Sequence, residues 1–327
     1  MKVLVTGANG LLGSHVVRAF LLKNYTVRVL VRKESDLRPL DGLSLDLLEG
    51  QITNKDDINR AVSGCDYIVH VAARTAQSPS NLEAYREPNI VSTRYLIEAC
   101  KQFGIKRFVF VSTANCFGNG TMEKPGNEET PFMPSLKKSG YAYSKYLAQQ
   151  LVLDEVENSN FDAVVVNPTF IIGTHDFKPS SGRIFNHILN RKIAFYPPGG
   201  KNFVDAEEAA RGVVNAMEKG RKGACYLLAG ENHSYLDFFR IVKKVSKQKT
   251  VLVPIPKWIL LFAGNMGSIL ERFLKLNIQL NKTNAKMLCL GNYFSAQKAI
   301  KELDFRIVPT EKSVEKAIRW LKENGCF

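Results

Sequence analysis

A glycine-rich turn directly after the first strand-like segment is the feature that most restricts the fold. "KVLVTG" at 2–7 has the apolar, β-branched composition of a buried strand, and helix-like sequence begins at residue 11. Gly7, Gly10 and Gly13 are spaced three apart, which lets the backbone turn tightly and approach a phosphate without an interfering Cβ. The turn predicts a dinucleotide-binding unit with G-x-x-G-x-x-G spacing instead of the commoner G-x-G-x-x-G. An ordinary glycine-rich turn is the alternative.

Short β-branched segments alternate with helix-length amphipathic segments through the first half of the chain. We expect strands at 2–7, 26–32, 44–50, 66–73, 107–113 and 162–169, and helices at 11–23, 54–63, 81–103 and 140–158. Such alternation predicts an α/β fold, in which a parallel sheet is doubly wound by right-handed crossovers (a Rossmann fold).

The alternation changes beyond about residue 173. One more strand is expected at 224–230. Helices are expected at 206–219, 234–247, 256–276, 283–290, 295–303 and 310–324. We therefore expect a dinucleotide-binding domain at 1–173. A smaller, mainly helical part at 174–327 would cap the substrate and interleave with the sheet near 203–230. Ligands of open α/β sheets bind at the carboxyl edge of the strands.

The net charge of +14 is unevenly distributed. Residues 1–173 contain 19 Lys and Arg against 18 Asp and Glu, whereas residues 174–327 contain 26 against 13. The excess indicates either an anionic ligand or a solvated basic face. Basic and aromatic residues are not interleaved as in single-strand binders, so nucleic acid is not an expected partner.

Cysteine spacing and hydropathy restrict the class of protein further. The six cysteines form no Cys-x-x-Cys pair, and no metal site is expected. The longest apolar segment, "WILLFAG" at 258–264, is far shorter than a membrane span, and we expect a cytoplasmic protein. The apolar 258–276 and the basic 240–249 leave a peripheral membrane role open. A cap helix over the substrate pocket is the preferred interpretation, so membrane association is not expected.

The end of the second strand bears on cofactor choice. Arg32 and Lys33 stand where an NAD-binding protein usually has an acidic residue for the ribose hydroxyls. A guanidinium suits a 2′-phosphate in charge and geometry, which favours NADP(H), with NAD(H) as the alternative. A solvent-facing arginine would also explain this position.

Tyr141 and Lys145 lie four residues apart in "SGYAYSKYLAQQLV", at the start of a predicted helix. Residues at this spacing share one helix face, so both side chains can reach a single site. The same spacing also occurs by chance on helix surfaces, so the pair alone does not distinguish a catalytic pair from two surface residues.

Five motifs in fixed order resolve the ambiguity: "TGANGLLG" (6–13), "DYIVHVAA" (66–73), "FVSTANCFG" (110–118), "YAYSK" (141–145) and "VVNPTFIIG" (165–173). With them the chain resembles the extended short-chain dehydrogenase/reductases over nearly its whole length. It is most similar to the dihydroflavonol-reductase-like and NAD(P)-dependent epimerase-like branch.

The resemblance implies a catalytic set. Tyr141 would exchange a proton with the substrate oxygen, Lys145 would lower the tyrosine pKa, and Thr113 would hydrogen-bond the same oxygen, with Ser112 as the neighbouring alternative. It also implies cofactor contacts at Gly7, Asn9, Gly10, Leu11, Leu12, Gly13, Arg32, Gln51, Ile52, Ala72, Ala73, Arg74, Tyr141, Lys145, Asn167, Pro168 and Thr169. Gln51 departs from the family's usual aspartate at the adenine amine.

Substrate contacts are expected from variable loops, with Asn115, Phe117, Met133, Arg183 and Phe203 as candidates. Phe117 replaces the tyrosine of many sugar-nucleotide enzymes, which favours a less polar substrate. Arg183 is either an anion ligand or a surface arginine. His70, alone on a buried strand, is expected to be a core residue.

An NADP(H)-dependent reductase of a ketone or aldehyde is the preferred function. A nucleotide-sugar epimerase is the alternative, and a dehydratase ranks below it because Ala114 and Asn115 replace the acidic residue expected after Thr113. A non-enzymatic cofactor-sensing protein is the third class, although such relatives often lose the tyrosine or lysine that are intact here.

The resemblance also implies a homodimer formed by two helices of each subunit, 88–103 and 140–158. Both have apolar residues beyond one sheet-facing stripe: Val91, Tyr95, Leu96, Tyr146, Leu147 and Leu151. A widened core stripe would equally explain this surplus.

Overall fold

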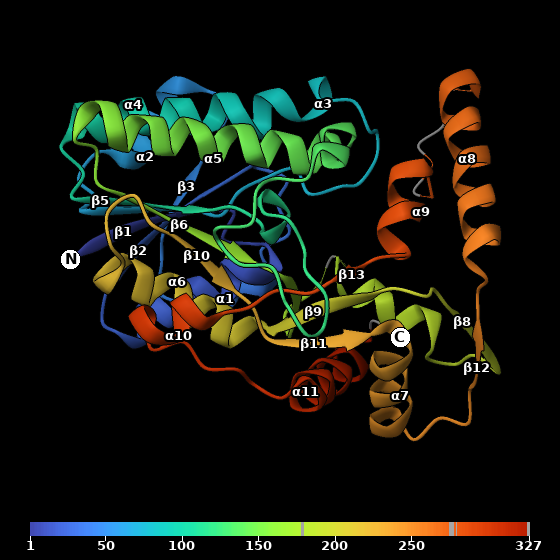
Figure 1. Cartoon of the computed structure of the whole chain (residues 1–327). Coiled ribbons are helices and arrows are strands. Elements are labelled where there is room, and N and C mark those ends of the chain that lie inside the picture. The colour runs from blue at the N-terminus through green and yellow to red at the C-terminus, as the bar shows by residue number, and fades with distance from the viewer. Residues whose placement is uncertain (178–179, 275–277, 279, 326–327) are drawn as a thin grey trace.

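A seven-stranded parallel sheet forms the centre of the computed structural model, which describes residues 1–177, 180–274, 278 and 280–325 (Figure 1). The strand order is β10-β6-β5-β4-β1-β2-β3. The strands are β1 (Lys2–Thr6), β2 (Thr26–Val31), β3 (Asp46–Glu49), β4 (Tyr67–His70), β5 (Arg107–Val111), β6 (Ala163–Pro168) and β10 (Cys225–Leu228). The predicted doubly wound α/β fold is confirmed. Because the order reverses between β1 and β4, the carboxyl edge opens there, where ligands bind in such sheets.

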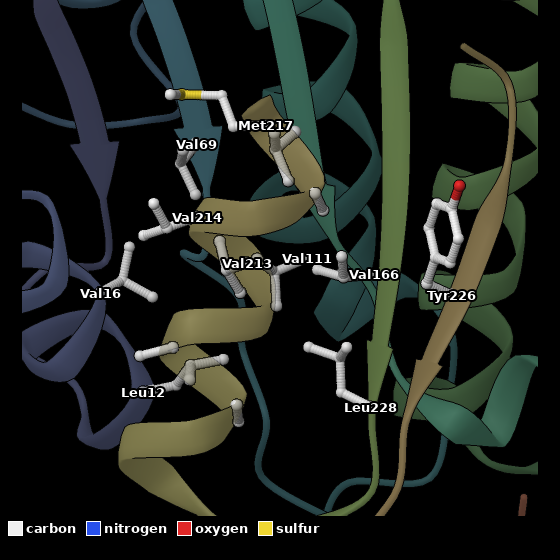
Figure 2. Close-up of a cluster of buried hydrophobic side chains, with 14 of the residues drawn as sticks. Leu12, Val16, Val69, Val111, Val166, Val213, Val214, Met217, Tyr226 and Leu228 are labelled. Carbon is white, nitrogen blue, oxygen red and sulfur yellow. The ribbon is translucent and has the colours of Figure 1, made fainter. Parts of the chain in front are cut away.

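Helices cover both faces of the sheet. One face carries α1 (Leu11–Leu22), α6 (Ala206–Lys219) and α10 (Gln297–Leu303), and the other carries α2 (Lys55–Val62), α4 (Ser92–Phe103) and α5 (Gly140–Ser159) (Figure 1). Figure 2 shows how Val16 of α1 and Val213 of α6 meet the strand valines in one buried layer. Burial of these two apolar layers is the main force that holds the sheet and its helices together.

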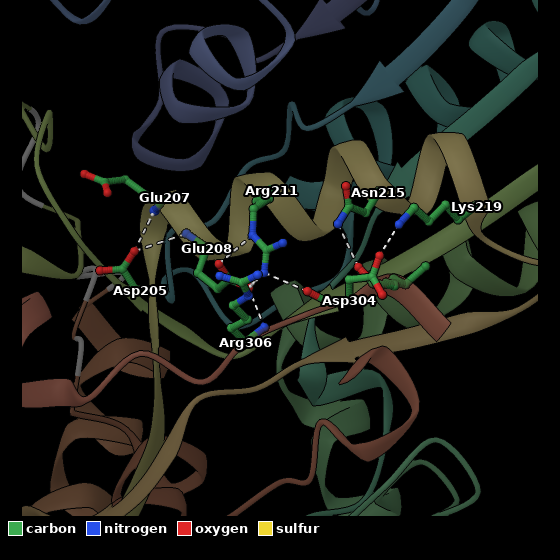
Figure 3. Close-up of polar contacts among 9 residues, drawn as sticks. Asp205, Glu207, Glu208, Arg211, Asn215, Lys219, Asp304 and Arg306 are labelled. Carbon is green, nitrogen blue, oxygen red and sulfur yellow. Dashed lines mark hydrogen bonds and ion pairs between the residues drawn. The ribbon is translucent and has the colours of Figure 1, made fainter. Parts of the chain in front are cut away.

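Polar contacts connect α6 to the segment 303–313, which leads from α10 into α11 (Figure 3). Arg211 donates to the carbonyl of Asp304 at 2.7 Å, and the Asn215 amide donates to that of Leu303 at 2.7 Å. Asp205 caps α6 by accepting from the backbone N–H groups of its first turn, and it also accepts from the Ser313 hydroxyl at 2.8 Å. One carboxylate therefore joins α6 to the C-terminal helix.

The remaining elements form the cap beside the sheet. They are β7 (Phe170–Ile172), β8 (Ile193–Tyr196), β9 (Gly200–Asp205), β11 (Glu231–Ser234), β12 (Val251–Pro254), β13 (Gly291–Asn292), α7 (Tyr235–Ser246), α8 (Lys257–Leu274), α9 (Lys282–Leu288) and α11 (Thr310–Glu323). Most of these residues are helical, as predicted, but the six short strands were missed. Segments such as "GKNFVD" are too short and too polar to show a clear strand period.

The single helix predicted at 81–103 is wrong in its first part. A short turn, α3 (Glu83–Tyr85), is followed by a π-helical turn at Arg86–Val91, and the regular α4 begins only at Ser92. Pro88 lacks the N–H that a regular helix would need there. The wider turn leaves Asn89 only 1% exposed, inside the protein.

The described residues contain neither a membrane-spanning helix nor a metal-binding cluster. No helix in these ranges has the length and hydropathy needed to cross a membrane. No three or more His, Cys, Asp and Glu side chains of the described ranges form a group that could hold a metal ion.

Candidate active site

The glycines of the phosphate turn are required for different reasons. Gly7 has a φ of +68°, and a Cβ there would lie 2.6 Å from the backbone nitrogen of Ala72. A Cβ on Gly13 would lie 2.0 Å from the carbonyl oxygen of Gly7. Gly10, by contrast, has an ordinary φ of −91°, and its Cβ would only touch the same oxygen at 3.4 Å. The fold therefore requires Gly7 and Gly13, whereas close approach of a ligand is the better explanation for Gly10.

The N-terminus of α1 behind this turn fits a pyrophosphate. No side chain caps the helix, and its first turn contains no acidic residue. Its free N–H groups and positive dipole end are therefore available to an anion. Asn9 is engaged with the backbone, because its amide donates to the carbonyl of Asp36 at 3.2 Å. Leu11 is half-buried at the turn, and Leu12 belongs to the core at 7% exposure.

The neighbouring strand ends lie on the same edge. Arg32 is exposed at the end of β2, and no ion-pair partner is found for it among the described residues. Gln51 is exposed after β3, with its backbone N–H donating to Asp57 at 2.9 Å, and Ile52 packs on the core. These positions suit the adenosine half of a dinucleotide.

Asn89, which the sequence analysis missed, holds the loop after β4. Its side-chain oxygen accepts from the N–H of Arg74 at 2.7 Å, and its amide donates to the Arg74 carbonyl at 3.2 Å and to the Ser144 hydroxyl at 2.9 Å. Ala72 and Ala73 of this loop are half-buried, and Ala72 donates to the Thr6 hydroxyl at 3.3 Å. One buried amide thus connects a predicted cofactor loop to α5.

The structure brings Thr113, Tyr141 and Lys145 together where β5 ends and α5 begins. Burial raises the pKa of Tyr141 to about 12, while its hydrogen bond with Thr113 acts in the opposite direction. Lys145, only 2% exposed, donates to the Val111 carbonyl at 2.8 Å and lies 4.0 Å from the ring centre of Phe110. Burial lowers the pKa of Lys145 to about 7. The trio combines a proton donor, a second hydroxyl and a cation, and its catalytic role stays a prediction.

Thr113 fits the predicted role better than Ser112. The Ser112 hydroxyl lies 3.2 Å from the Cys116 sulfur and is turned into the interior. Thr113 instead reaches Tyr141, and its own backbone carbonyl is held from behind by Asn167 at 2.9 Å.

Asn167 lies behind the site. It is 0% exposed, and its amide also donates to Gln149 of α5 at 2.7 Å. Pro168 is buried next to it, and the half-buried Thr169 donates to Asn202 at 2.7 Å. These contacts fix β5, β6 and α5 relative to one another, so Asn167 positions the site instead of lining it.

The substrate candidates lie in different environments. Asn115 is half-buried and donates its N–H to the Thr113 hydroxyl at 3.3 Å. Met133 is half-buried, and Arg183 is exposed. Phe117 and Phe203 are 9% and 2% exposed in packed cores, and the Phe203 ring stacks on Phe238 at 4.1 Å. Neither phenylalanine presents an open face, and all five roles stay predictions.

Two further polar side chains lie near this edge. His70 is a fully buried core residue, whose Nδ1 lies 2.8 Å from the Thr6 hydroxyl, and burial lowers its pKa well below 6.5. Lys201 of β9, which the sequence did not single out, is half-buried with its ammonium 5.0 Å from the ring centre of Phe170. No hydrogen-bond acceptor for it is found in the described part of the chain, and burial lowers its pKa to about 8.

Replacing Lys145 with methionine should stabilise the protein at low pH. With its pKa lowered from 10.5 to about 7, the folded chain releases a proton between these values that the unfolded chain retains. The contribution of Lys145 to the free energy of unfolding of the wild type therefore rises as the pH increases across that window. Below pH 7 the buried lysine is charged in the folded state, and its destabilising effect is complete. We expect Lys145→Met to raise the free energy of unfolding at pH 6 by on the order of 2 kcal/mol, which corresponds to roughly 4 °C in Tm.

Thermal unfolding of wild type and variant at pH 6 and at pH 9.5 tests this. The gain should shrink at the higher pH, where the wild-type lysine is neutral in the folded state. Lys137→Met is the control, since Lys137 is exposed. Equal Tm differences at both pH values would contradict the prediction.

A phosphate turn at a helix N-terminus, with Tyr141 and Lys145 of α5 reaching the end of β5, is typical of nicotinamide-dependent oxidoreductases of the extended short-chain type. Sequence comparison agrees, because residues 3–229 match the NAD dependent epimerase/dehydratase family. Since that match covers well over half of the chain, the protein belongs to this family.

Individual relatives cover the whole chain. It is 26% identical to sterol demethylase protein B of Methylococcus capsulatus, over 100% of both chains. It is 29% identical to a putative dihydroflavonol 4-reductase of Synechocystis sp., over 98% of this chain and 94% of that one. The crystal structure of gox2253 superposes with a TM-score of 0.87 at 29% identity, covering 99% and 98% of the two chains.

Proposed function

We propose that the protein is an NADP(H)-dependent reductase of a ketone or aldehyde. The observation that carries the proposal is the hydrogen bond between the Thr113 and Tyr141 side chains; Tyr141 lies on the same helix as the buried Lys145, whose ammonium contacts the end of β5. Burial raises the pKa of Tyr141 to about 12, and the expected lowering of this pKa by Lys145 is not found in this structure, so the tyrosine is protonated at neutral pH. Carbonyl reduction needs such a proton at the new hydroxyl oxygen.

In this proposal each part of the site has a separate role in binding or proton transfer. The α1 N-terminus binds the pyrophosphate, and NADPH, when bound, supplies the hydride. Thr113 donates a hydrogen bond to the substrate carbonyl oxygen and orients it. Tyr141 donates the proton to that oxygen, and Lys145, when protonated, adds positive charge to the site.

The relatives and the residues around the trio support a substrate less polar than a nucleotide sugar. The two relatives above are named for a sterol and for a dihydroflavonol. Ala114 and Asn115 offer no carboxylate beside Thr113, and Phe117 has no hydroxyl. A nucleotide-sugar epimerase stays the alternative, because the family contains epimerases.

A panel of carbonyl compounds and nucleotide sugars, with NADPH oxidation as readout, tests the proposal. A reductase must release NADP after each turnover, whereas an epimerase reuses a retained cofactor. We expect purified protein without stoichiometric nicotinamide and net NADPH oxidation with at least one carbonyl compound. Retained cofactor together with sugar interconversion would favour the epimerase.

Arg32→Asp should weaken the preference for NADPH. The change removes the proposed 2′-phosphate partner and adds a repulsive charge, so the preference for NADPH over NADH should fall more than tenfold, about 1.4 kcal/mol or more. Titration of both cofactors measures it. Arg94→Asp on the exposed side of α4 makes the same charge change as a control. Equal wild-type affinities for NADPH and NADH would contradict the proposed preference.

We also propose a homodimer through α4 and α5, with a smaller surface than the sequence indicated. Leu96 is 0% exposed in the core and cannot contribute to a dimer surface, so its assignment to the apolar residues outside the core stripe is wrong. The half-buried Val91, Tyr95, Tyr146, Leu147 and Leu151 remain. Light scattering on dilute protein should give about twice 36.6 kDa, and the mass of a single chain would contradict the dimer.

A further inference from the structure

The outer face of α8 carries a continuous stripe of exposed apolar side chains. Trp258, Phe262 and Phe273 are 71%, 65% and 76% exposed. Others on the helix are at least 39% exposed, namely Ile259, Met266, Ile269 and Leu270. The spacing 258, 262, 266, 269, 273 follows one helix face. Large apolar patches on a protein surface usually mark an interaction site.

The opposite face of α8 is fixed by close packing on α9. A Cβ on Gly264 would lie 2.3 Å from the Ala285 Cβ, and a Cβ on Gly267 would lie 2.0 Å from the Leu280 carbonyl oxygen. Figure 1 shows α8 at the outer edge of the molecule, with α9 between it and the main body. The orientation of the helix is therefore set by its glycine face, and the apolar stripe points away from the protein. For 258–274 this differs from the expectation that the apolar segment 258–276 lies buried over a substrate pocket, and positions 275 and 276 of that prediction lie outside the described residues.

The β8–β12 ribbon adds to the same edge of the molecule. Ile193, Phe195 and Val251 are 53%, 59% and 58% exposed. Val251 pairs with Ile193 in a parallel register, so these two side chains project on the same face of the ribbon. Only two residues separate β12 from α8. We call the ribbon residues and the α8 stripe together the apolar edge.

Positive charge flanks the apolar edge. Arg191, Lys192, Lys247, Lys249 and Lys257 are exposed, and no ion-pair partner is found for any of them among the described residues. The segments 191–196 and 247–274 contain a single carboxylate, Glu271. It accepts from the backbone N–H of Ser80 at 3.2 Å and does not neutralise these cations.

We propose that the apolar edge docks on an anionic lipid bilayer. Exposed aromatic and aliphatic side chains beside unpaired cations are the combination that holds an amphipathic helix in the plane of a membrane interface. Trp258 at the start of the helix suits the headgroup level. A second copy of the chain fits less well, because a two-fold contact would place the same cations opposite each other.

Vesicle sedimentation without substrate tests this independently of the proposed reductase activity. The probes are phosphatidylcholine vesicles and vesicles of equal parts phosphatidylcholine and phosphatidylserine. Wild type should bind the second far better, and added salt should weaken binding. Trp258→Ser with Phe262→Ser should weaken it at least tenfold, whereas Leu22→Ser, at a residue 85% exposed on α1, should not.

Charge reversal gives a second readout. Lys249→Glu with Lys257→Glu should weaken binding to phosphatidylserine vesicles at least tenfold, since each cation near a membrane contributes about fivefold. Lys312→Glu, an exposed lysine of α11, is the control. The proposal is overturned if wild type binds neither vesicle, if the α8 variants bind like wild type, or if those variants instead split a dimer into single chains.

Discussion

Tyr141→Phe should lower the rate of carbonyl reduction by about 10² or more and leave folding and cofactor affinity nearly unchanged. The hydroxyl is the group that meets Thr113, and it is protonated at neutral pH because burial raises its pKa. Phenylalanine retains the buried ring and removes only the proton donor. The loss should therefore appear in kcat.

Steady-state kinetics with a substrate from the carbonyl panel measures this effect. Tyr143→Phe is a matched control, because Tyr143 lies on the same helix in a ring cluster with Phe132 and Tyr146. It should retain most of its activity. A Tyr141→Phe enzyme of near-full activity would show that another group supplies the proton.

Gly13→Ala should mainly destabilise the fold, whereas Gly10→Ala should mainly weaken cofactor binding. A Cβ on Gly13 would collide with the Gly7 carbonyl at 2.0 Å, between backbone atoms that cannot move apart cheaply. We expect a loss on the order of 4 kcal/mol in the free energy of unfolding, or no folded protein. Gly10→Ala meets only an ordinary contact at 3.4 Å and should cost about 1 kcal/mol or less.

The cofactor measurement separates the two further. Gly10→Ala should remain folded yet bind NADPH at least tenfold more weakly, because its methyl group would stand where a pyrophosphate approaches the backbone. Denaturant unfolding and NADPH titration provide the two readouts. If Gly10→Ala bound the cofactor as wild type does, the pyrophosphate would have to lie elsewhere.

The sequence allowed the sheet and the gathering of Thr113, Tyr141 and Lys145 near the end of β5 to be predicted, because both depend on local patterns; the catalytic roles of these residues stay a prediction. β-branched segments, the glycine turn and the motif order specify the strands and the chain positions of Thr113, Tyr141 and Lys145. What failed depends on three-dimensional neighbours. Asn89 is an ordinary residue in a helix-like segment until the π-helical turn directs it to Arg74, and Pro88 was its only sequence signal.

The solvent exposure of α8 could not be predicted for a similar reason. Its composition fits a buried cap helix as well as a surface helix. The packing of Gly264 on α9, and of Gly267 on Leu280 just before α9, decides which face turns outward. Likewise, Lys201 is one of many lysines in the sequence, and its half-buried, unpaired environment arises from the pairing of β7 with β9.

The path of the chain limits how this enzyme can evolve. Two elements of the sheet domain, strand β10 and helix α6, come after the first cap segments in the chain. Helix α6 packs on α1, and Asp205 joins α6 to the last helix. A gene fragment ending at residue 173 would leave β6 with an unpaired edge and α1 without its apolar partner. Recombination cannot exchange the cap as a cassette at a single junction. Substitutions and loop changes within the cap, by contrast, leave the pairing of β10 with β6 and the packing of α6 on α1 in place.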